Sequence, residues 1–442
     1  MAAKQTVGVA LVGCGTVGGG VVRLLTHDAD LLAGRSGIRL QLRHLLDKDF
    51  TRARSLGVSE KVFRHDLSPI LSDPDTAIVI ELAGGITFAR SIVEQALKAG
   101  KHVVTANKAL LAHHGNKLFA LARKHGVCIA FEASCAGGVP VIGTLLNGLL
   151  ANNIEALYGI VNGTCNFILT SMTDRGAAYD KVLSEAQQAG LAEADPTLDV
   201  KGIDSAHKLA ILAALAFGQK IDFQAIHTEG IDTLDITDVR YGIELGYRVK
   251  LLAIAQRQQD GLSLRVHPAF IPNDHPLARV SGPFNAVSIY GHATGHTMYY
   301  GRGAGSMPTA SAVVADLLDV ALGNAPRRFQ TLGIWPDRSK PANQLPMDRV
   351  CCRYYLRVTC KDSPGVLAKI AAVLGSHQIS ISSVLQHEPS SLADHGVPVI
   401  ITTHRATEGN MEKARAQMDA LPAVLSPTVC IRIVEEHPEP AL

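Results

Sequence analysis

The stretch Val7-Gly8-Val9-Ala10-Leu11-Val12-Gly13-Cys14-Gly15-Thr16-Val17-Gly18 decides the fold. Residues 7–12 form an apolar run typical of a buried strand, and residues 17–25 show the apolar spacing of a helix. The glycines between them allow a tight turn, a close approach of the backbone to a pyrophosphate and close helix–strand packing. The start of the helix also offers unpaired N–H groups to phosphate oxygens. This arrangement predicts a dinucleotide site at Gly13, Gly15, Thr16, Val17 and Gly18.

The alternation of strands and helices continues through the first third of the chain. Apolar runs predict strands at residues 40–46, 77–82, 103–105 and 127–131, and a helix at residues 90–99. Strands that alternate with helices form βαβ units and a parallel sheet. We therefore expect an α/β, Rossmann-like, doubly wound dinucleotide-binding domain over residues 1–135.

The end of the second predicted strand bears on the choice of cofactor. Asp47 stands where an acid would bind the ribose 2′-OH of NAD. Lys48 and Arg52 follow closely, and they could instead meet the 2′-phosphate of NADP or belong to a solvated charged loop. The sequence leaves both cofactors, NAD and NADP, open.

The middle of the chain, residues 136–305, predicts an α+β substrate domain. Helices are expected at 139–150, 166–172, 179–189 and 205–217, and strands at 251–256, 262–270, 286–290 and 297–300. Asp260-Gly261 is a hairpin turn between two of these strands. Residues 335–350 are rich in Pro and Asn and lack periodicity, so we interpret them as a linker.

Residues 351–436 have a compact pattern of their own. Strands are expected at 354–359, 379–386, 397–403 and 429–434, and helices at 365–375 and 410–421. The order β-α-β-β-α-β is that of a ferredoxin-like domain.

Composition excludes several classes of protein. The 442 residues carry a net charge of +2 without a basic run, which disfavours nucleic acid and anionic membranes as partners. No signal peptide and no membrane span is expected. The 8 Cys are scattered and form no CxxC pair, which favours reduced thiols in the cytoplasm over a zinc site or disulfides.

Five motifs in order resemble the homoserine dehydrogenase family across roughly residues 1–330. They are Thr105-Ala106-Asn107-Lys108; Glu132-Ala133-Ser134-Cys135-Ala136-Gly137-Gly138-Val139-Pro140; Asn162-Gly163-Thr164-Cys165-Asn166; Gly190-Leu191-Ala192-Glu193-Ala194-Asp195-Pro196-Thr197-Leu198-Asp199-Val200-Lys201-Gly202-Ile203-Asp204 with His207-Lys208; and Gly301-Arg302-Gly303-Ala304-Gly305-Ser306-Met307-Pro308-Thr309-Ala310-Ser311. The resemblance implies a return helix over residues 306–334 that packs on the first domain. It also implies a homodimer or homotetramer.

The reaction implied by the resemblance is the reversible reduction of L-aspartate 4-semialdehyde to L-homoserine with NAD(P)H, in threonine, methionine and isoleucine biosynthesis. Lys208 matches the family's proton donor, and Asp204 would act with it. Lys108 matches a residue near nicotinamide and substrate, and Glu193 and Asp199 match acids of the substrate region.

Two further parts of the resemblance concern the cofactor and an ion. Gly303 is expected to contact the dinucleotide together with the glycine loop and Lys108. Glu132, Cys135, Gly137 and Val139 match a loop that holds a monovalent cation, such as sodium, mostly through backbone carbonyls.

The chemistry of these residue types supports the same reading. Hydride addition to an aldehyde builds negative charge on the oxygen, and an ammonium group can supply both a positive charge and a proton there. Lys108 and Lys208 could do this, while carboxylates of residues 193–204 suit the substrate's α-ammonium. Viewed alone, Asp204 and Lys208 are four residues apart near a helix start, a pattern that is more often a surface ion pair or an acid that complements the helix dipole.

Two alternatives remain at this stage. Cys135 in a glycine-rich loop could be the nucleophile of a phosphorylating semialdehyde dehydrogenase, which forms a thioester. The chain could also be a regulatory protein that binds cofactor and amino acid without turnover, although Lys108 and Lys208 disfavour this. His207 is interpreted as a packed helix residue rather than a second acid.

The stretch Cys360-Lys361-Asp362-Ser363-Pro364-Gly365-Val366-Leu367 resembles the loop that leads into the first helix of ACT domains. ACT domains bind amino acids at subunit interfaces, and a helix start suits a carboxylate. L-threonine is the expected effector, as a feedback inhibitor. A domain kept only for dimerisation is the alternative.

Overall fold

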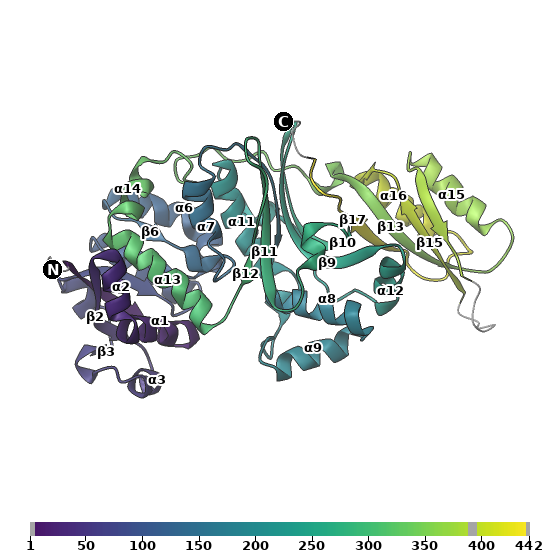
Figure 1. The fold of residues 1–442 in the computed structure, drawn as a ribbon. Coiled ribbons are helices and arrows are strands. Elements are labelled where there is room, and N and C mark those ends of the chain that lie inside the picture. Colours follow the sequence, from purple (N-terminus) through teal and green to yellow (C-terminus); the bar gives the residue numbers. More distant parts are fainter. Residues whose placement is uncertain (1–4, 388–395, 439–442) are drawn as a thin grey trace.

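The computed structural model describes residues 5–387 and 396–438. Figure 1 shows three parts in a row: a parallel sheet with helices at the N-terminal end, a large middle sheet, and a C-terminal domain on its far side. The fold class expected from the sequence is confirmed.

The N-terminal sheet has six parallel strands in the order β3-β2-β1-β4-β5-β6. This is the doubly wound strand order that binds dinucleotides where the order reverses, beside β1. The strands are β1 (Gln5–Val12), β2 (Ile38–Leu46), β3 (Phe63–Arg64), β4 (Thr76–Glu81), β5 (His102–Thr105) and β6 (Ile129–Ala130). The helices are α1 (Thr16–His27), α2 (Ala29–Ser36), α3 (Thr51–Ser55), α4 (Ser68–Ser72), α5 (Thr87–Lys98) and α6 (Lys108–Lys124).

The return segment expected over residues 306–334 consists of two helices rather than one. These are α13 (Ser306–Ala321) and α14 (Asn324–Thr331), which are bent by 77° relative to each other. Gly323 ends α13 in the left-handed region, at a φ of 82°. α13 packs against α1, where a Cβ on Gly20 would lie only 2.8 Å from Ala310 Cβ.

The middle sheet continues without interruption into the C-terminal domain. Its strands follow the order β12-β11-β7-β9-β10-β17-β13-β15-β14. In the middle part these are β7 (Ile154–Ile160), β9 (Tyr247–Gln258), β10 (Gly261–Pro272), β11 (Phe284–Gly291) and β12 (Gly295–Arg302), with β8 (His227–Thr228) beside β10. β10 and β17 are parallel, and Ala269 pairs with Arg432.

Helices cover one face of the middle sheet. They are α8 (Gly163–Arg175), α9 (Tyr179–Gln188), α10 (Thr197–Val200), α11 (Ile203–Phe217) and α12 (Ile236–Glu244). α11 is buried on almost all sides, because it packs against α6 of the first domain and against β9 of the sheet. Its polar residues are therefore placed between the two domains.

The C-terminal domain has the β-α-β-β-α-β order of a ferredoxin-like fold. Its elements are β13 (Cys351–Cys360), α15 (Val366–Ser376), β14 (Ile381–Leu385), β15 (Val397–Thr403), α16 (Glu408–Asp419) and β17 (Val429–Ile433), with a short β16 (Ala406–Thr407) beside β13. The segment expected as a linker is packed on the rest of the chain. Trp335 is buried against Phe119 and Phe329, and Pro341 bridges to Lys220.

No single helix within residues 5–387 and 396–438 is both long and apolar enough to span a membrane. The bent pair of α13 and α14 satisfies the same test by length and composition only when both helices are taken together.

Candidate active site

A buried carboxylate joins two lysines from different domains. Lys108 opens α6 directly after β5, whereas Asp204 and Lys208 lie one turn apart on α11. Lys108 Nζ is 2.7 Å from Asp204 Oδ1, and Lys208 Nζ is 2.7 Å from Asp204 Oδ2. The structure thus brings together the three residues that the sequence analysis named as catalytic, at the seam between the two domains.

The charges of this cluster are held in place by burial and by each other. Asp204 is 5% exposed. Burial alone would raise the pKa of its carboxyl, but Lys208 and Lys108 outweigh burial and hold that pKa well below its usual range. Burial lowers the pKa of Lys108, yet Asp204 more than offsets this, so that the pKa of Lys108 lies above its ordinary value. Two ammonium groups, from different domains, share the Asp204 carboxylate at the seam.

Lys208 has a second fixed contact. Its Nζ donates a hydrogen bond of 2.6 Å to the backbone carbonyl of Val161, just after β7. His207 points elsewhere: its ring stacks on Phe223 and lies 3.4 Å from His113, nitrogen to nitrogen. Burial lowers the pKa of His207 to about 4, so it is neutral at pH 7. It is a packed helix residue rather than a second acid.

The two remaining candidate acids differ in their surroundings. Asp199 in α10 accepts a hydrogen bond of 2.7 Å from Asn162, which also contacts Asp204. Glu193 is exposed, and its carboxylate has no hydrogen bond or ion pair with the part of the chain that the structure describes. The structure therefore places Asp199 beside the lysine cluster, but it shows no contact that brings Glu193 there.

The glycine loop has the geometry that its sequence predicts. Gly13 has a φ of 94°, and a Cβ there would lie 2.6 Å from the carbonyl oxygen of Leu82. A Cβ on Gly18 would lie 2.1 Å from the carbonyl oxygen of Gly13, whereas above Gly15 the space is open. α1 starts at Thr16 without a side-chain cap, so its first N–H groups are available to a phosphate.

Side chains beside this loop bear on the 2′-position of the ribose. The Asp47 carboxylate accepts hydrogen bonds from the backbone N–H groups of Cys14 (2.5 Å) and Lys48 (2.6 Å). Arg52 lies over the start of α1, since its Nε would be 2.7 Å from a Cβ on Gly19. An anion at this place would meet the Arg52 guanidinium.

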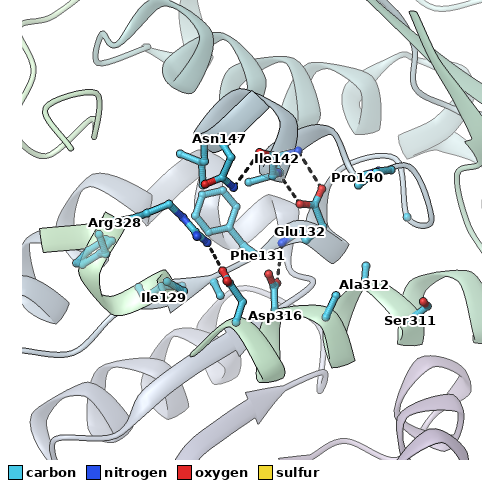
Figure 2. Close-up of a pocket in the computed structure, with 18 of the residues that line it drawn as sticks. Ile129, Phe131, Glu132, Pro140, Ile142, Asn147, Ser311, Ala312, Asp316 and Arg328 are labelled. Carbon is cyan, nitrogen blue, oxygen red and sulfur yellow. Dashed lines mark hydrogen bonds and ion pairs between the residues drawn. The ribbon is translucent and has the colours of Figure 1, made fainter. Parts of the chain in front are cut away.

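The loop expected to hold a cation follows β6 and borders a cavity of about 380 Å³. The Glu132 carboxylate accepts hydrogen bonds from the backbone of Ile142 and Gly143, and its own N–H donates to Asp316 (Figure 2). Burial raises the pKa of Glu132 to about 7. Gly303 touches this loop, because a Cβ on Gly137 would lie 2.4 Å from its carbonyl oxygen.

Cys135 is wholly buried beneath Lys208, and its Sγ is 3.9 Å from the Lys208 carbonyl oxygen. Burial raises the pKa of the Cys135 thiol to about 12. A thiolate is the reactive form of cysteine, so this side chain is a poor nucleophile at neutral pH. The structure argues against the thioester alternative.

Replacing Cys135 with serine is therefore expected to keep oxidoreductase turnover within a few-fold of the wild type, because the chemistry needs no thiolate. The measurement is the steady-state change in nicotinamide absorbance. A second test asks whether pretreatment with iodoacetamide, which alkylates reactive thiols, inactivates the wild-type enzyme. Complete loss of turnover in a folded Cys135→Ser protein would restore the thiol mechanism.

The sequence analysis includes Asn162 in a motif but assigns it no role. Its position directly after a strand and before a helix was the available signal, since asparagine there is a favoured N-cap. The acids that accept its amide protons lie on α10 and α11, well beyond Asn162 in the sequence, so local sequence does not reveal them.

Comparison with known proteins extends these observations. Family models match residues 13–132 ("Homoserine dehydrogenase, NAD binding domain"), 140–318 ("Homoserine dehydrogenase") and 354–423 ("ACT domain"). A homoserine dehydrogenase of Pseudomonas aeruginosa is 46% identical over 432 residues, which cover 97% of this chain and 99% of the relative.

Solved structures agree with the family models. A homoserine dehydrogenase from Thiobacillus denitrificans matches with a TM-score of 0.91 and 45% identity, over 98% of this chain and 99% of that one. A hyperthermophilic archaeal homoserine dehydrogenase, in complex with NADPH, matches with a TM-score of 0.60 and 27% identity, over 72% of this chain and 98% of that one. The chain therefore belongs to the homoserine dehydrogenase family and is an NAD(P)-dependent oxidoreductase with a C-terminal ACT domain.

Proposed function

We propose that the chain reduces L-aspartate 4-semialdehyde reversibly to L-homoserine, with Lys208 as the proton donor. The observation that carries this proposal is the buried cluster of Lys108, Asp204 and Lys208. Bound NAD(P)H supplies the hydride. The oxygen of the aldehyde gains negative charge as the hydride arrives, and the ammonium of Lys208 both stabilises that charge and donates the proton.

The other residues of the cluster prepare Lys208 for this step. Asp204 and the Val161 carbonyl fix two directions around Lys208 Nζ, which leaves one N–H for the substrate oxygen. Lys108 lies across Asp204 and adds positive charge at the same place. In the reverse direction, neutral Lys208 accepts the proton of the alcohol.

The substrate's α-ammonium requires carboxylates, and we assign Asp199 and Glu193 to it. Asp199 is half-buried beside the cluster, so it would orient the amino-acid end of the substrate. Glu193 has no competing side-chain partner within the described residues and is free to reach a ligand.

For the cofactor we propose a preference for NADP. The Asp47 carboxylate is engaged by backbone N–H groups, while Arg52 stands over the start of α1, where a 2′-phosphate would gain a charge-assisted hydrogen bond. The NADPH complex of the archaeal homoserine dehydrogenase supports the same choice.

We also propose that the loop of Glu132, Cys135, Gly137 and Val139 holds a monovalent cation. Consecutive positive φ angles at Ala136 (54°) and Gly137 (49°) bend this loop sharply. The carbonyls of Cys135 and Gly137 accept no hydrogen bond from the residues described, so oxygen ligands are available to a hard cation such as sodium.

The C-terminal domain is proposed to bind L-threonine and to inhibit the enzyme, in a homodimer or homotetramer located in the cytoplasm. The domain matches the ACT family, and its loop before α15 is exposed. Gly365 has a φ of 87° and stands directly before the helix, and the start of a helix suits a carboxylate. Threonine is an end product of the pathway in which homoserine is made.

Replacing Gly365 with valine is expected to raise the threonine concentration for half-inhibition about 10-fold, since the left-handed conformation costs a side chain about 1–3 kcal/mol. Basal turnover should not change. Gly375→Ala, near the other end of α15, is the matched control, because a Cβ there meets no atom within 4 Å. Unchanged inhibition in the Gly365→Val enzyme would place the effector elsewhere.

The proposed function is tested by nicotinamide absorbance during incubation with L-homoserine in monovalent salt. NAD and NADP are supplied separately, each with and without L-threonine. We expect turnover with a lower KM for NADP than for NAD, and we expect threonine to inhibit it. A folded sample without turnover on either cofactor would contradict the proposed function and favour a non-catalytic sensor.

A further inference from the structure

We infer that Asn162 is a positioning residue: it fixes Asp199 where the substrate's ammonium would bind and fixes Asp204 against Lys208. The inference rests on the proposed function, because it assigns a role in that same site. Asn162 follows β7, is 5% exposed, and caps the start of α8.

The orientation of the Asn162 amide is fixed by its own cap. Its Oδ1 accepts a hydrogen bond of 2.8 Å from the backbone N–H of Cys165. An N–H must meet an acceptor, so this contact identifies Oδ1 and leaves Nδ2 on the other side. The two protons of Nδ2 therefore face away from the helix and toward the lysine cluster.

Both protons of Nδ2 are donated to acids that lie far from Asn162 in the sequence. Nδ2 donates to Asp199 Oδ1 at 2.7 Å and to Asp204 Oδ2 at 2.9 Å. The same Oδ2 accepts from Lys208 Nζ. Asn162 is thus a neutral donor between two carboxylates, one proposed to hold the substrate's ammonium and one that holds the proton donor.

A neutral donor has a specific advantage at this place. Two carboxylates so close together repel each other. An amide offers each a hydrogen bond without altering the charge balance with the lysines. The Asn162 amide spends its donors on the two acids and its oxygen on the helix cap, so its proposed effect on the reaction passes through the two acids.

Two substitutions separate this role from helix capping. Serine is also a favoured N-cap, so Asn162→Ser should keep the cap of α8 but lose both carboxylate contacts. Hydrogen bonds to charged groups predict a loss in kcat/KM of about 10- to 100-fold, with KM for L-homoserine raised and kcat lowered. Cofactor affinity, measured by NADPH fluorescence, should not change. Thr407→Ala, which removes the cap of α16 in the C-terminal domain, is the control and should have wild-type kinetics.

Asn162→Asp tests the charge argument. It keeps the cap acceptor but adds a third carboxylate, so the pKa of one acid in the group rises. At low pH that acid is protonated and donates as the amide does, so activity relative to the wild type should fall as pH rises.

Wild-type kcat and KM in Asn162→Ser would overturn the inference. So would a pH–activity profile of Asn162→Asp that runs parallel to that of the wild type. Absence of wild-type turnover on L-homoserine would instead overturn the proposed function, so the two failures are distinguishable.

Discussion

Replacing Lys208 with alanine is expected to lower kcat/KM for L-homoserine by about 10²–10⁴-fold, the usual contribution of general acid–base catalysis. The variant loses the group that exchanges a proton with the substrate oxygen. Lys108 remains beside Asp204 and still supplies positive charge, so some activity should persist. Cofactor affinity should be nearly unchanged, because the glycine loop lies in the first domain, whereas Lys208 lies on α11 of the middle domain.

Lys101→Ala is the matched control for the loss of a buried lysine. Lys101 is also buried, and its Nζ donates to the backbone carbonyl of Asp73, outside the site. The control should lose stability but keep kcat, while Lys208→Ala should lose kcat and keep NADPH binding. An active Lys208→Ala enzyme would exclude Lys208 as the proton donor.

Local patterns carried much of the fold and of the site. The glycine loop and the strand–helix alternation predicted the doubly wound sheet, and α11 was expected from its apolar run. β7 and α12 were not expected. β7 is buried along nearly its whole length and so lacks the alternation of polar and apolar residues that marks a half-exposed strand, and α12 mixes polar with apolar residues. Burial of one face by distant segments is not visible in local periodicity.

The prediction of one continuous α-helix over residues 139–150 is wrong. The segment holds a short helix, Val141–Gly143, followed by a π-helical turn, Thr144–Gly148. The Glu132 carboxylate takes the N–H groups of Ile142 and Gly143, and glycines at both ends of the π turn loosen the backbone. The apolar spacing was real, but a buried side chain from ten residues earlier decided the backbone geometry.

The junction between the C-terminal domain and the middle sheet was likewise hidden in the sequence. The C-terminal domain, expected to be separate, is joined to the middle sheet where β17 pairs with β10. This pairing depends on a register between residues 163 positions apart in the chain, such as Ala269 and Arg432. The same holds for Arg432, whose two acidic partners lie in different domains.

Replacing Arg432 with methionine is expected to destabilise this junction by about 3–5 kcal/mol, the usual cost of removing one partner from a buried ion pair. Arg432 is 7% exposed on β17. Its guanidinium binds both oxygens of Glu229, at 2.7 and 2.8 Å, and both oxygens of Glu408 at the start of α16. Without it, the buried Glu408 carboxylate keeps a hydrogen bond from Tyr354 but no cation among these contacts.

The effect should depend on pH with a definite sign. Burial would raise the pKa of Glu229, but hydrogen bonds from His227 and Arg432 outweigh it and hold that pKa well below its ordinary value. A carboxyl with a lowered pKa stabilises the fold above its unfolded value of about 4.3, and this stabilisation is lost as pH falls. The difference between wild type and Arg432→Met should therefore be large at pH 7 and shrink below about pH 4.

Hydrogen exchange of the β17 and β10 amides measures this directly, because the chain has several domains and one global melting transition does not isolate the junction. Faster exchange in Arg432→Met, confined to these strands and α16, is the expected result. Arg54→Met, which removes the exposed pair with Glu60, is the control and should change stability by less than about 1 kcal/mol. If both variants protect β17 equally, the strand pairing alone holds the C-terminal domain in place, and the Arg432 network contributes specificity of register rather than stability.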